Sequence, residues 1–184
     1  MPKISQLKIK SIRSCKNLRG KRVLLRLDLN VPMDGGRIID FTRIERALPT
    51  IKFLQKHKAR IIILSHLGES SASLKEVARY LNKFVQVGFI PEVTGKKVED
   101  TVAVMKEGGI LMLENLRSEK GEENNNTFFA MSLSRLGDIY VNDAFSVSHR
   151  AHASIVSLPK LLSSFMGLHF EEELWDNFDA EIVE

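Results

Sequence analysis

Several polar and charged side chains stand directly after short aliphatic runs, where a buried strand would end. Asp28 and Asn30 follow the first run, His66 follows the second, and Arg117 follows the third. Parallel strands bring their carboxyl ends to one edge of a sheet, and ligands bind in the crevice beyond those ends. We therefore expect these four residues to line one binding site.

Two further arginines, Arg43 and Arg150, lie in segments that follow these strand ends. Guanidinium groups match phosphate and carboxylate oxygens in a bidentate fork, so several arginines beside an imidazole indicate an anionic ligand. For any one arginine the alternative is a solvated position or a local ion pair, because most charged side chains are exposed. Their concentration near strand ends favours the ligand site.

Asp28 and His66 each allow two interpretations. Asp28 and Asn30 are two residues apart and therefore point to the same side of an extended chain. Because a carboxylate cannot itself hold an anion, Asp28 would accept a hydrogen bond from a ligand hydroxyl or position an arginine. Alternatively, it caps the turn before Val31 and Pro32. His66 would bind a ligand oxygen or a loop carbonyl.

Other chemical signals in the sequence are weak. His149 and His152 have an i, i+3 spacing, but no further ligand of suitable spacing accompanies them, so we expect no metal site. Glu122 and Glu123 are expected to be a solvated charge run. No phosphate-binding loop, dinucleotide fingerprint, nucleophile elbow or catalytic Cys/His pair is present. Residues 1–184 should therefore hold an acidic small molecule without the groups that react with it.

The elements that must position these residues alternate along the chain. Near-continuous aliphatic runs are typical of strands buried on both faces, and they alternate with segments of helical periodicity. This alternation predicts right-handed crossovers and a doubly wound, mostly parallel α/β sheet with helices on both faces, a Rossmann-like three-layer sandwich. The expected strands are 22–29, 60–64, a short one within 84–90, 110–115 and 138–142.

The expected helices follow from periodicity and capping residues. Thr42 is expected to cap a helix that Pro49 kinks or restarts, and Ser73 and Asn126 are expected to cap two later helices. Further helices are predicted at 96–105 and from 159 to 178. Residues 1–20 are predicted to be irregular, and the glycine-rich stretch 34–36 to be a turn or hairpin tip.

Length and composition restrict the classes of protein. A chain of 184 residues suits one domain. Its net charge of +4 is scattered without a Lys/Arg block, which argues against nucleic acid as a partner. Cys15 is the only cysteine, so no internal disulfide can form and a reducing compartment is expected. Without a secretory leader or a long apolar run, we expect a cytoplasmic protein with no membrane span.

Eight segments of the sequence closely resemble phosphoglycerate kinase, in the family's order and with plausible spacing. They are RLDLNVP at 26–32, TRI at 42–44, ALPTI at 47–51, SHLG at 65–68, LENLR at 113–117, KGEE at 120–123, VNDAF at 141–145 and HRAHAS at 149–154. The resemblance covers nearly the whole chain but only the N-terminal, acid-substrate-binding half of the family's enzyme. It implies that residues 1–168 form that domain and that residues 169–184 begin the interdomain helix.

The resemblance also implies a reaction and a site. The site would bind 3-phosphoglycerate or 1,3-bisphosphoglycerate through six residues, with Arg43 also stabilising the phosphoryl group in flight: Asp28, Asn30, Arg43, His66, Arg117 and Arg150. His149 would lie close to the substrate. The Mg-ATP or Mg-ADP complex would bind a C-terminal nucleotide-binding domain, supplied in cis or in trans. Residues 1–184 alone are expected to be inactive.

One departure from the family pattern bears on binding. The family's usual His-Leu-Gly-Arg is His66-Leu67-Gly68-Glu69 here, so a carboxylate replaces a phosphate-binding arginine. This replacement would weaken substrate binding markedly unless Lys75 or another cation substitutes. This favours, as an alternative, a non-catalytic phospho-acid-binding or regulatory module. A third possibility is one chain of a split kinase that docks through the 159–178 segment. Its apolar side chains would then be only partly buried: Leu161, Leu162, Phe165, Leu168 and Trp175.

Overall fold

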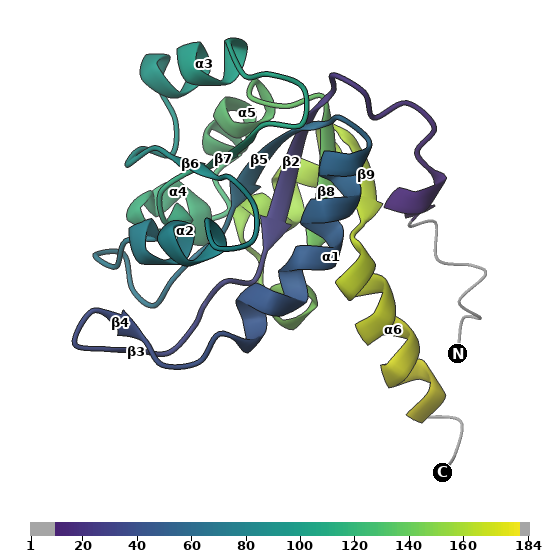
Figure 1. Ribbon diagram of the computed structural model, residues 1–184. Helices are drawn as coiled ribbons and strands as arrows, with labels where there is room; N and C mark the ends of the chain where they lie inside the picture. The colour runs from purple at the N-terminus through teal and green to yellow at the C-terminus, as the bar shows by residue number, and fades with distance from the viewer. Residues whose placement is uncertain (1–9, 181–184) are drawn as a thin grey trace.

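The computed structural model describes the backbone of residues 10–180 and the side chains of residues 10–176 (Figure 1). Its main sheet contains β1 (Lys10–Ser11), β2 (Arg22–Leu27), β5 (Arg60–Leu64), β6 (Gly88–Phe89), β7 (Ile110–Met112), β8 (Ile139–Asp143) and β9 (Ser163–Met166). The strand order is β1-β9-β8-β2-β5-β7-β6, and every pair is parallel. The predicted parallel sheet is thus confirmed.

Helices cover both faces of this sheet. One face packs against α1 (Thr42–Lys56), α2 (Lys75–Leu81) and the start of α6 (Leu168–Ala180), and the other against α3 (Lys96–Ala103) and α5 (Thr127–Ser134). The alternation along β2 shows the two faces, because Val23 and Leu25 belong to the first apolar cluster and Leu24 to the second. The predicted three-layer sandwich is confirmed.

Short helical turns connect the remaining segments. They are η2 (Ile12–Ser14), η3 (Leu116–Ser118), α4 (Lys120–Glu123), η4 (Phe145–Val147), the π-helical turn η5 (Ala153–Ser157) and η6 (Leu158–Lys160). A separate hairpin pairs β3 (Met33–Asp34) with β4 (Arg37–Ile38). Its tip residues Gly35 and Gly36 both have positive φ, as the favoured two-residue hairpin turn requires. The expected turn at 34–36 is therefore confirmed.

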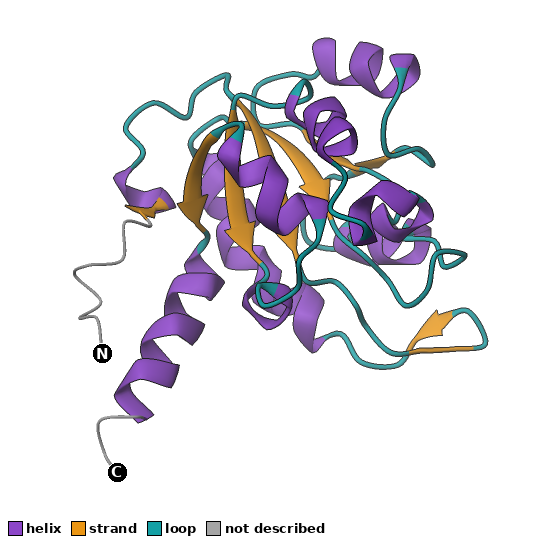
Figure 2. Cartoon of the chain, turned by 180° about the vertical axis from the view of Figure 1, so that it is seen from behind, coloured by secondary structure: helices purple, strands orange, loops and turns teal. Residues whose placement is uncertain are grey.

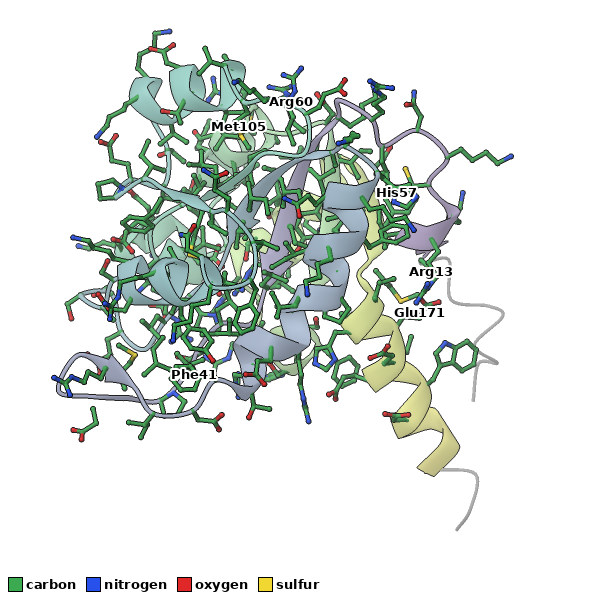
Figure 3. All side chains as sticks on the ribbon, in the orientation of Figure 1. Arg13, Phe41, His57, Arg60, Met105 and Glu171 are labelled. Carbon is green, nitrogen blue, oxygen red and sulfur yellow. The ribbon has the colours of Figure 1, made fainter. Side chains whose placement is uncertain are left out.

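The carboxyl ends of the parallel strands lie at one edge of the sheet, and the long strand arrows in Figure 2 all point toward that edge. The chain leaves β2 through α1 to reach β5 on one side, whereas β8 pairs with β2 on the other side. The crevice at such a reversal is where ligands bind in open α/β sheets. Phe41, which precedes α1, lies at this edge, and Arg60 and Met105 lie at the opposite edge (Figure 3).

Helix α1 differs from its prediction in two details. It begins with Phe41 as the preceding residue, and Asp40 accepts a hydrogen bond from the Thr42 N–H at 2.8 Å, so Thr42 is the first helical residue and not the cap. Pro49 neither ends nor restarts the helix. Its missing N–H removes a single backbone hydrogen bond, and Pro49 faces solvent while Ile44 and Ile51 are buried.

The other caps are closer to expectation. Asn126 caps α5 by accepting from the Phe129 N–H at 3.0 Å, as predicted. Ser73 accepts from the Lys75 N–H at 3.2 Å, although the residue directly before α2 is Leu74. The strands that end at Leu27 and Met112 are shorter than predicted, because their last residues turn into the polar loops of the site.

The prediction of one helix over 159–178 is wrong. Residues 163–166 form β9 between β8 and β1, and α6 begins only at Leu168, whose N–H donates to Thr50 Oγ1 at 3.0 Å. Apolar residues at 161, 162, 165 and 168 mimic helical spacing, but β8 offers an edge whose backbone groups need partners. Of the side chains named for docking, Leu161 and Trp175 are exposed and Leu162 and Phe165 are half-buried, as that alternative expects, whereas Leu168 is buried at 6% exposure.

The lead-in is also more ordered than predicted from residue 10 onward. Lys10 and Ser11 pair with Phe165 and Met166 as the edge strand β1, while residues 1–9 lie outside the described part. Arg13 and Glu171 approach to 3.6 Å and lie side by side in Figure 3, which links this edge to α6.

Candidate functional site

Asp28 organises the end of β2. Its Oδ2 accepts hydrogen bonds from Arg43 in the first turn of α1 and from the Ser146 hydroxyl, and its Oδ1 accepts from the Asn30 N–H at 3.1 Å. Both sequence interpretations are therefore realised, since Asp28 positions an arginine and also shapes the turn before Val31. Ser146 is a site residue that the sequence reasoning did not single out.

A hollow of about 200 Å³ opens beside the Asp28–Arg43 pair. It lies at the carboxyl ends of β2 and β8, and its lining has groups of both charges: Asp28, Arg43, Arg46, Ala47, Asp143, Phe145, Ser146, His169 and Glu173. Arg117 and Arg150 do not line it. Arg43 therefore does not share this hollow with the other two arginines.

Asp143 lines this hollow at the end of β8. It is 3% exposed, its Oδ1 accepts from the Phe170 N–H at 2.8 Å, and its Oδ2 has no hydrogen-bond partner among the described residues. Burial raises the pKa of this carboxyl above its ordinary value, although hydrogen bonds from Thr50 and Phe170 act in the opposite direction. Asp143 thus ties the start of α6 to the sheet.

His66 follows β5 and is 3% exposed. Arg26 Nη2 lies 3.1 Å from His66 Nδ1. Because a guanidinium only donates, Nδ1 accepts this hydrogen bond, and the ring proton is assigned to Nε2. Burial, followed by the charges of Arg26 and Arg117, lowers the pKa of His66 to about 3. His66 is therefore a neutral hydrogen-bond donor at physiological pH and adds no positive charge to the site.

Arg26 is the principal residue that the sequence reasoning missed. It lies within β2 at 1% exposure and donates from Nε to Ser154 Oγ at 3.0 Å and from Nη1 to the Leu27 carbonyl. Burial lowers its pKa and the charge of Glu122 opposes that change. A charged residue inside an aliphatic strand was the available signal, because a buried arginine requires partners.

Glu122 contradicts the expectation of a solvated charge run. It is 0% exposed and accepts from the Ser154 hydroxyl at 2.5 Å and from the Ser154 N–H at 2.9 Å. Its neighbour Glu123 is exposed and lies 3.3 Å from Arg117 Nε. The difference arises because α4 turns Glu122 toward the interior, where η5 presents Ser154.

Arg117 and Asn30 hold the loop after His66 from two sides. Arg117 Nη1 donates to the Gly68 carbonyl, and Asn30 Oδ1 accepts from the Gly68 N–H at 2.7 Å. The Arg117 side chain is 14% exposed, and its Nε, although near Glu123, is not aligned for a hydrogen bond. Both predicted residues therefore lie at the same loop.

Asn115 fixes the same loop from beneath and was also missed as a site residue. Its buried Nδ2 donates to the carbonyls of Leu67, Glu69 and Ala72 at 2.8, 2.9 and 2.8 Å. Its Oδ1 accepts from the N–H groups of Leu67 and Arg117 at 3.2 and 3.1 Å. One amide therefore sets the path of the loop that carries Glu69, whose side chain is exposed.

Arg150 is exposed, and its guanidinium has no hydrogen bond or ion pair within residues 10–176. Its charge nevertheless contributes to lowering the pKa of both His66 and His152, so it lies near both rings. Asp28 and Arg117 also act on His66. The charges of Asp28, Arg117 and Arg150 thus act on His66, and Arg43 is paired with Asp28.

Two further expectations concern a metal site and a membrane span. His149 is exposed, and His152 Nδ1 lies 3.9 Å from Glu122. Among residues 10–176 no three His, Cys, Asp or Glu side chains are grouped so that they could hold a metal ion. Within the described helices, none has the length and apolar character needed to cross a bilayer.

Comparison with known proteins identifies the family. The sequence pattern of the family described as phosphoglycerate kinase matches residues 12–180. The chain belongs to the phosphoglycerate kinase family. It is 46% identical over 175 residues to the phosphoglycerate kinase of Wolbachia pipientis subsp. Culex pipiens, covering 91% of this chain and 44% of the relative. It is 49% identical over 165 residues to that of Orientia tsutsugamushi strain Ikeda, covering 85% and 41%.

Solved phosphoglycerate kinase structures have the same fold. The enzyme from Pyrococcus horikoshii OT3 superposes with a TM-score of 0.85 at 32% identity, covering 90% of this chain and 44% of that one. The enzyme from Coxiella burnetii gives 0.80 at 38% identity, with 90% and 43% covered. The chain therefore corresponds to the N-terminal portion of phosphoglycerate kinase and spans less than half the length of these relatives.

Proposed function

We propose that the chain is the acid-substrate-binding half of a phosphoglycerate kinase and that its strand-end crevice binds 3-phosphoglycerate or 1,3-bisphosphoglycerate. The observation that carries this proposal is that Arg117 and Asn30 both hold Gly68, two residues after a neutral His66, while Arg43 is held at Asp28 and the charge of Arg150 reaches His66. Several guanidinium groups at one edge of the sheet suit a ligand that carries a carboxylate and a phosphate. A cytoplasmic location would suit this role in glycolysis.

Each residue has a distinct role in this proposal. Arg150, which has no protein partner within residues 10–176, and Arg117 would bind the anionic end of the ligand. His66 would donate from Nε2 to a ligand oxygen. Arg43, 45% exposed beside the hollow, would stabilise charge on the phosphoryl group in flight, and Asp28 would keep its fork in place. Asn30 would hold the loop after His66 in place by accepting the Gly68 N–H at 2.7 Å.

The Mg-nucleotide complex does not fit the residues described here. Residues 10–176 contain no grouped metal ligands, and residues 1–184 contain no glycine-rich phosphate loop. In phosphoryl transfer the metal ion neutralises charge on the nucleotide phosphates. We therefore place the nucleotide on a C-terminal domain, in cis or in trans, with α6 as the start of the connecting helix. In Figure 1, α6 runs outward from the edge that carries the site.

The isolated 184-residue polypeptide should bind substrate without turnover. The test mixes 1,3-bisphosphoglycerate, Mg-ADP and the purified chain and measures ATP. No ATP above the buffer blank is expected, and activity should appear when a C-terminal half from a family member is added in trans. ATP formation by the chain alone, after removal of contaminating kinase, would contradict the proposal of inactivity.

A second candidate, a non-catalytic binding or regulatory module, rests on Glu69. Its carboxylate stands on the loop beside Arg117, where the family has arginine, and it would repel a phosphate. Calorimetric titration of 3-phosphoglycerate into wild type and Glu69→Arg separates the candidates. Measurable wild-type binding favours the kinase half, whereas binding only in Glu69→Arg favours the module. Glu99→Arg, an equal charge reversal on α3, controls for net charge, and no binding by either protein would refute both candidates.

A further inference from the structure

A buried carboxylate lies behind the candidate site, and the proposed reaction does not use it. Glu122 is 0% exposed and does not line the hollow beside Arg43. Both of its oxygens accept hydrogen bonds from one residue, Ser154, at 2.5 and 2.9 Å. A fully buried carboxylate is costly unless it is paired, so this arrangement needs a cationic group nearby.

That cationic group is Arg26, and Ser154 connects the two. The Ser154 hydroxyl donates its only proton to Glu122 and accepts from Arg26 Nε at 3.0 Å. The Tyr140 hydroxyl, itself buried, donates to the Ser154 carbonyl at 2.7 Å and fixes the turn that presents this serine. The hydrogen bonds therefore run in one direction, from Arg26 through Ser154 to Glu122, and such chains strengthen each member.

The other end of the Arg26 fork determines the state of His66. With Nε directed to Ser154 and Nη1 to the Leu27 carbonyl, Nη2 faces His66 Nδ1 at 3.1 Å. His66 Nε2 has no hydrogen-bond partner among the described residues and is not closed off from solvent. The free Nε2–H therefore remains available to a bound group.

We propose that Glu122 and Ser154 are positioning residues that act through Arg26 to hold His66 in the Nε2–H tautomer, ready to donate to the ligand. The planar guanidinium has one orientation that serves Ser154, Leu27 and His66 together, so loss of its Nε partner frees the whole fork to rotate. That Ser154 and Glu122 fix the His66 tautomer does not depend on the ligand, whereas donation from His66 to the ligand rests on the proposed function.

The tautomer is measured first, without ligand. Long-range proton–nitrogen correlation spectra of the 15N-labelled chain report which nitrogen of each imidazole carries the proton. The His66 signals are assigned by their loss in His66→Gln. We expect a single Nε2–H ring that does not titrate between pH 5 and about pH 8, as its low pKa requires. A His66 ring that carries its proton on Nδ1, or that titrates near its ordinary pKa, would overturn the proposal.

Ser154→Ala then tests the connection, and Ser157→Ala is the matched control. Ser157 lies in the same turn, η5, but its hydroxyl donates to Asn125 Oδ1 at 2.7 Å and not to Glu122. In Ser154→Ala we expect mixed His66 tautomers and 3-phosphoglycerate affinity weakened by up to about tenfold, the loss of one hydrogen bond. Ser157→Ala should match wild type in both measurements. Identical His66 spectra in the two variants would refute the role of Ser154.

Two further variants keep the test decisive if Ser154→Ala folds poorly. Arg26→Lys retains the positive charge but not the fork, so mixed tautomers with a still low His66 pKa are expected. Glu122→Gln keeps the shape of the side chain but replaces one accepting oxygen with an NH₂ group, which cannot accept from either the Ser154 N–H or the Ser154 hydroxyl. This variant should also give mixed His66 tautomers. A pure Nε2–H ring in both would overturn the proposal. Failure of wild type to bind 3-phosphoglycerate would refute the proposed function and leave the tautomer result intact.

Discussion

Replacing Asn115 by alanine should be the most damaging small change at the site. Its buried amide joins the loop after β5 to the loop after β7 through contacts to Leu67, Glu69, Ala72 and Arg117. No other described side chain offers both a donor and an acceptor to Leu67. The substitution therefore removes the link that sets the position of the His66–Glu69 loop.

The magnitude follows from which partners can reach water. Leu67 is 2% exposed, so its N–H and C=O are left buried without partners, and each such group costs about 1–3 kcal/mol. Glu69 is exposed and Ala72 is half-buried, so their carbonyls regain hydrogen bonds from water and add less. We expect a loss of about 3–5 kcal/mol in the free energy of unfolding, a large share of the total for one domain.

The assay is equilibrium unfolding in urea, compared with Asn82→Ala as the matched control. Asn82 also joins backbone groups, donating to the Ala78 and Val87 carbonyls at 3.0 and 2.8 Å and accepting from the Val87 N–H at 2.9 Å. It is exposed, so water can replace its amide and the expected loss is about 0.5–1.5 kcal/mol. If Asn115→Ala costs no more than Asn82→Ala, with equal m-values, the reasoning about buried partners is wrong.

Three further predictions concern single groups. The unfolded chain protonates His66 below its ordinary pKa of 6.5, whereas the folded ring binds a proton only near pH 3. The free energy of unfolding should therefore fall as the pH drops from 6.5 toward 3. Urea unfolding at several pH values should show a smaller pH dependence of the free energy of unfolding in His66→Gln. Gly167→Ala would place its Cβ 2.2 Å from the buried Asp143 Oδ1, so a loss of about 1–3 kcal/mol is expected by thermal or urea unfolding. A loss below the lower figure would mean that Asp143 moves freely. Asp28→Asn removes the charge that holds Arg43, so calorimetry should show weaker 3-phosphoglycerate binding, and unchanged affinity would show that Asp28 does not position Arg43 for the ligand.

Periodicity determined the sheet because its strands are buried on both faces. The aliphatic runs at β2, β5, β7 and β8 admit few alternatives, and the helical segments between them require right-handed crossovers. The same pattern predicts from the sequence alone that Asp28, His66 and Arg117 lie at one edge of the sheet. The resemblance to phosphoglycerate kinase then identified the family, because its segments span nearly the whole chain.

Short elements escaped prediction because their stability comes from distant partners. The strand β9 forms because β8 and β1 offer backbone groups to it, and nothing within residues 159–178 indicates this. Pro49 was expected to disturb α1, but the helix is held by its apolar face and Pro49 is on the other face. Local sequence reports propensity, whereas pairing across the sheet is decided by the whole fold.

The sequence alone determined which residue types stand at the strand ends and therefore that an anionic ligand is favoured there. Only the tertiary structure decided their electrical state and grouping. It showed that Glu122 is buried and joined to Arg26 through Ser154, that His66 is neutral, and that Arg43 lies at a hollow apart from Arg117 and Arg150. The physical reason is that burial and neighbouring charges set a pKa and a hydrogen-bond pattern, and both depend on contacts between residues far apart in the chain.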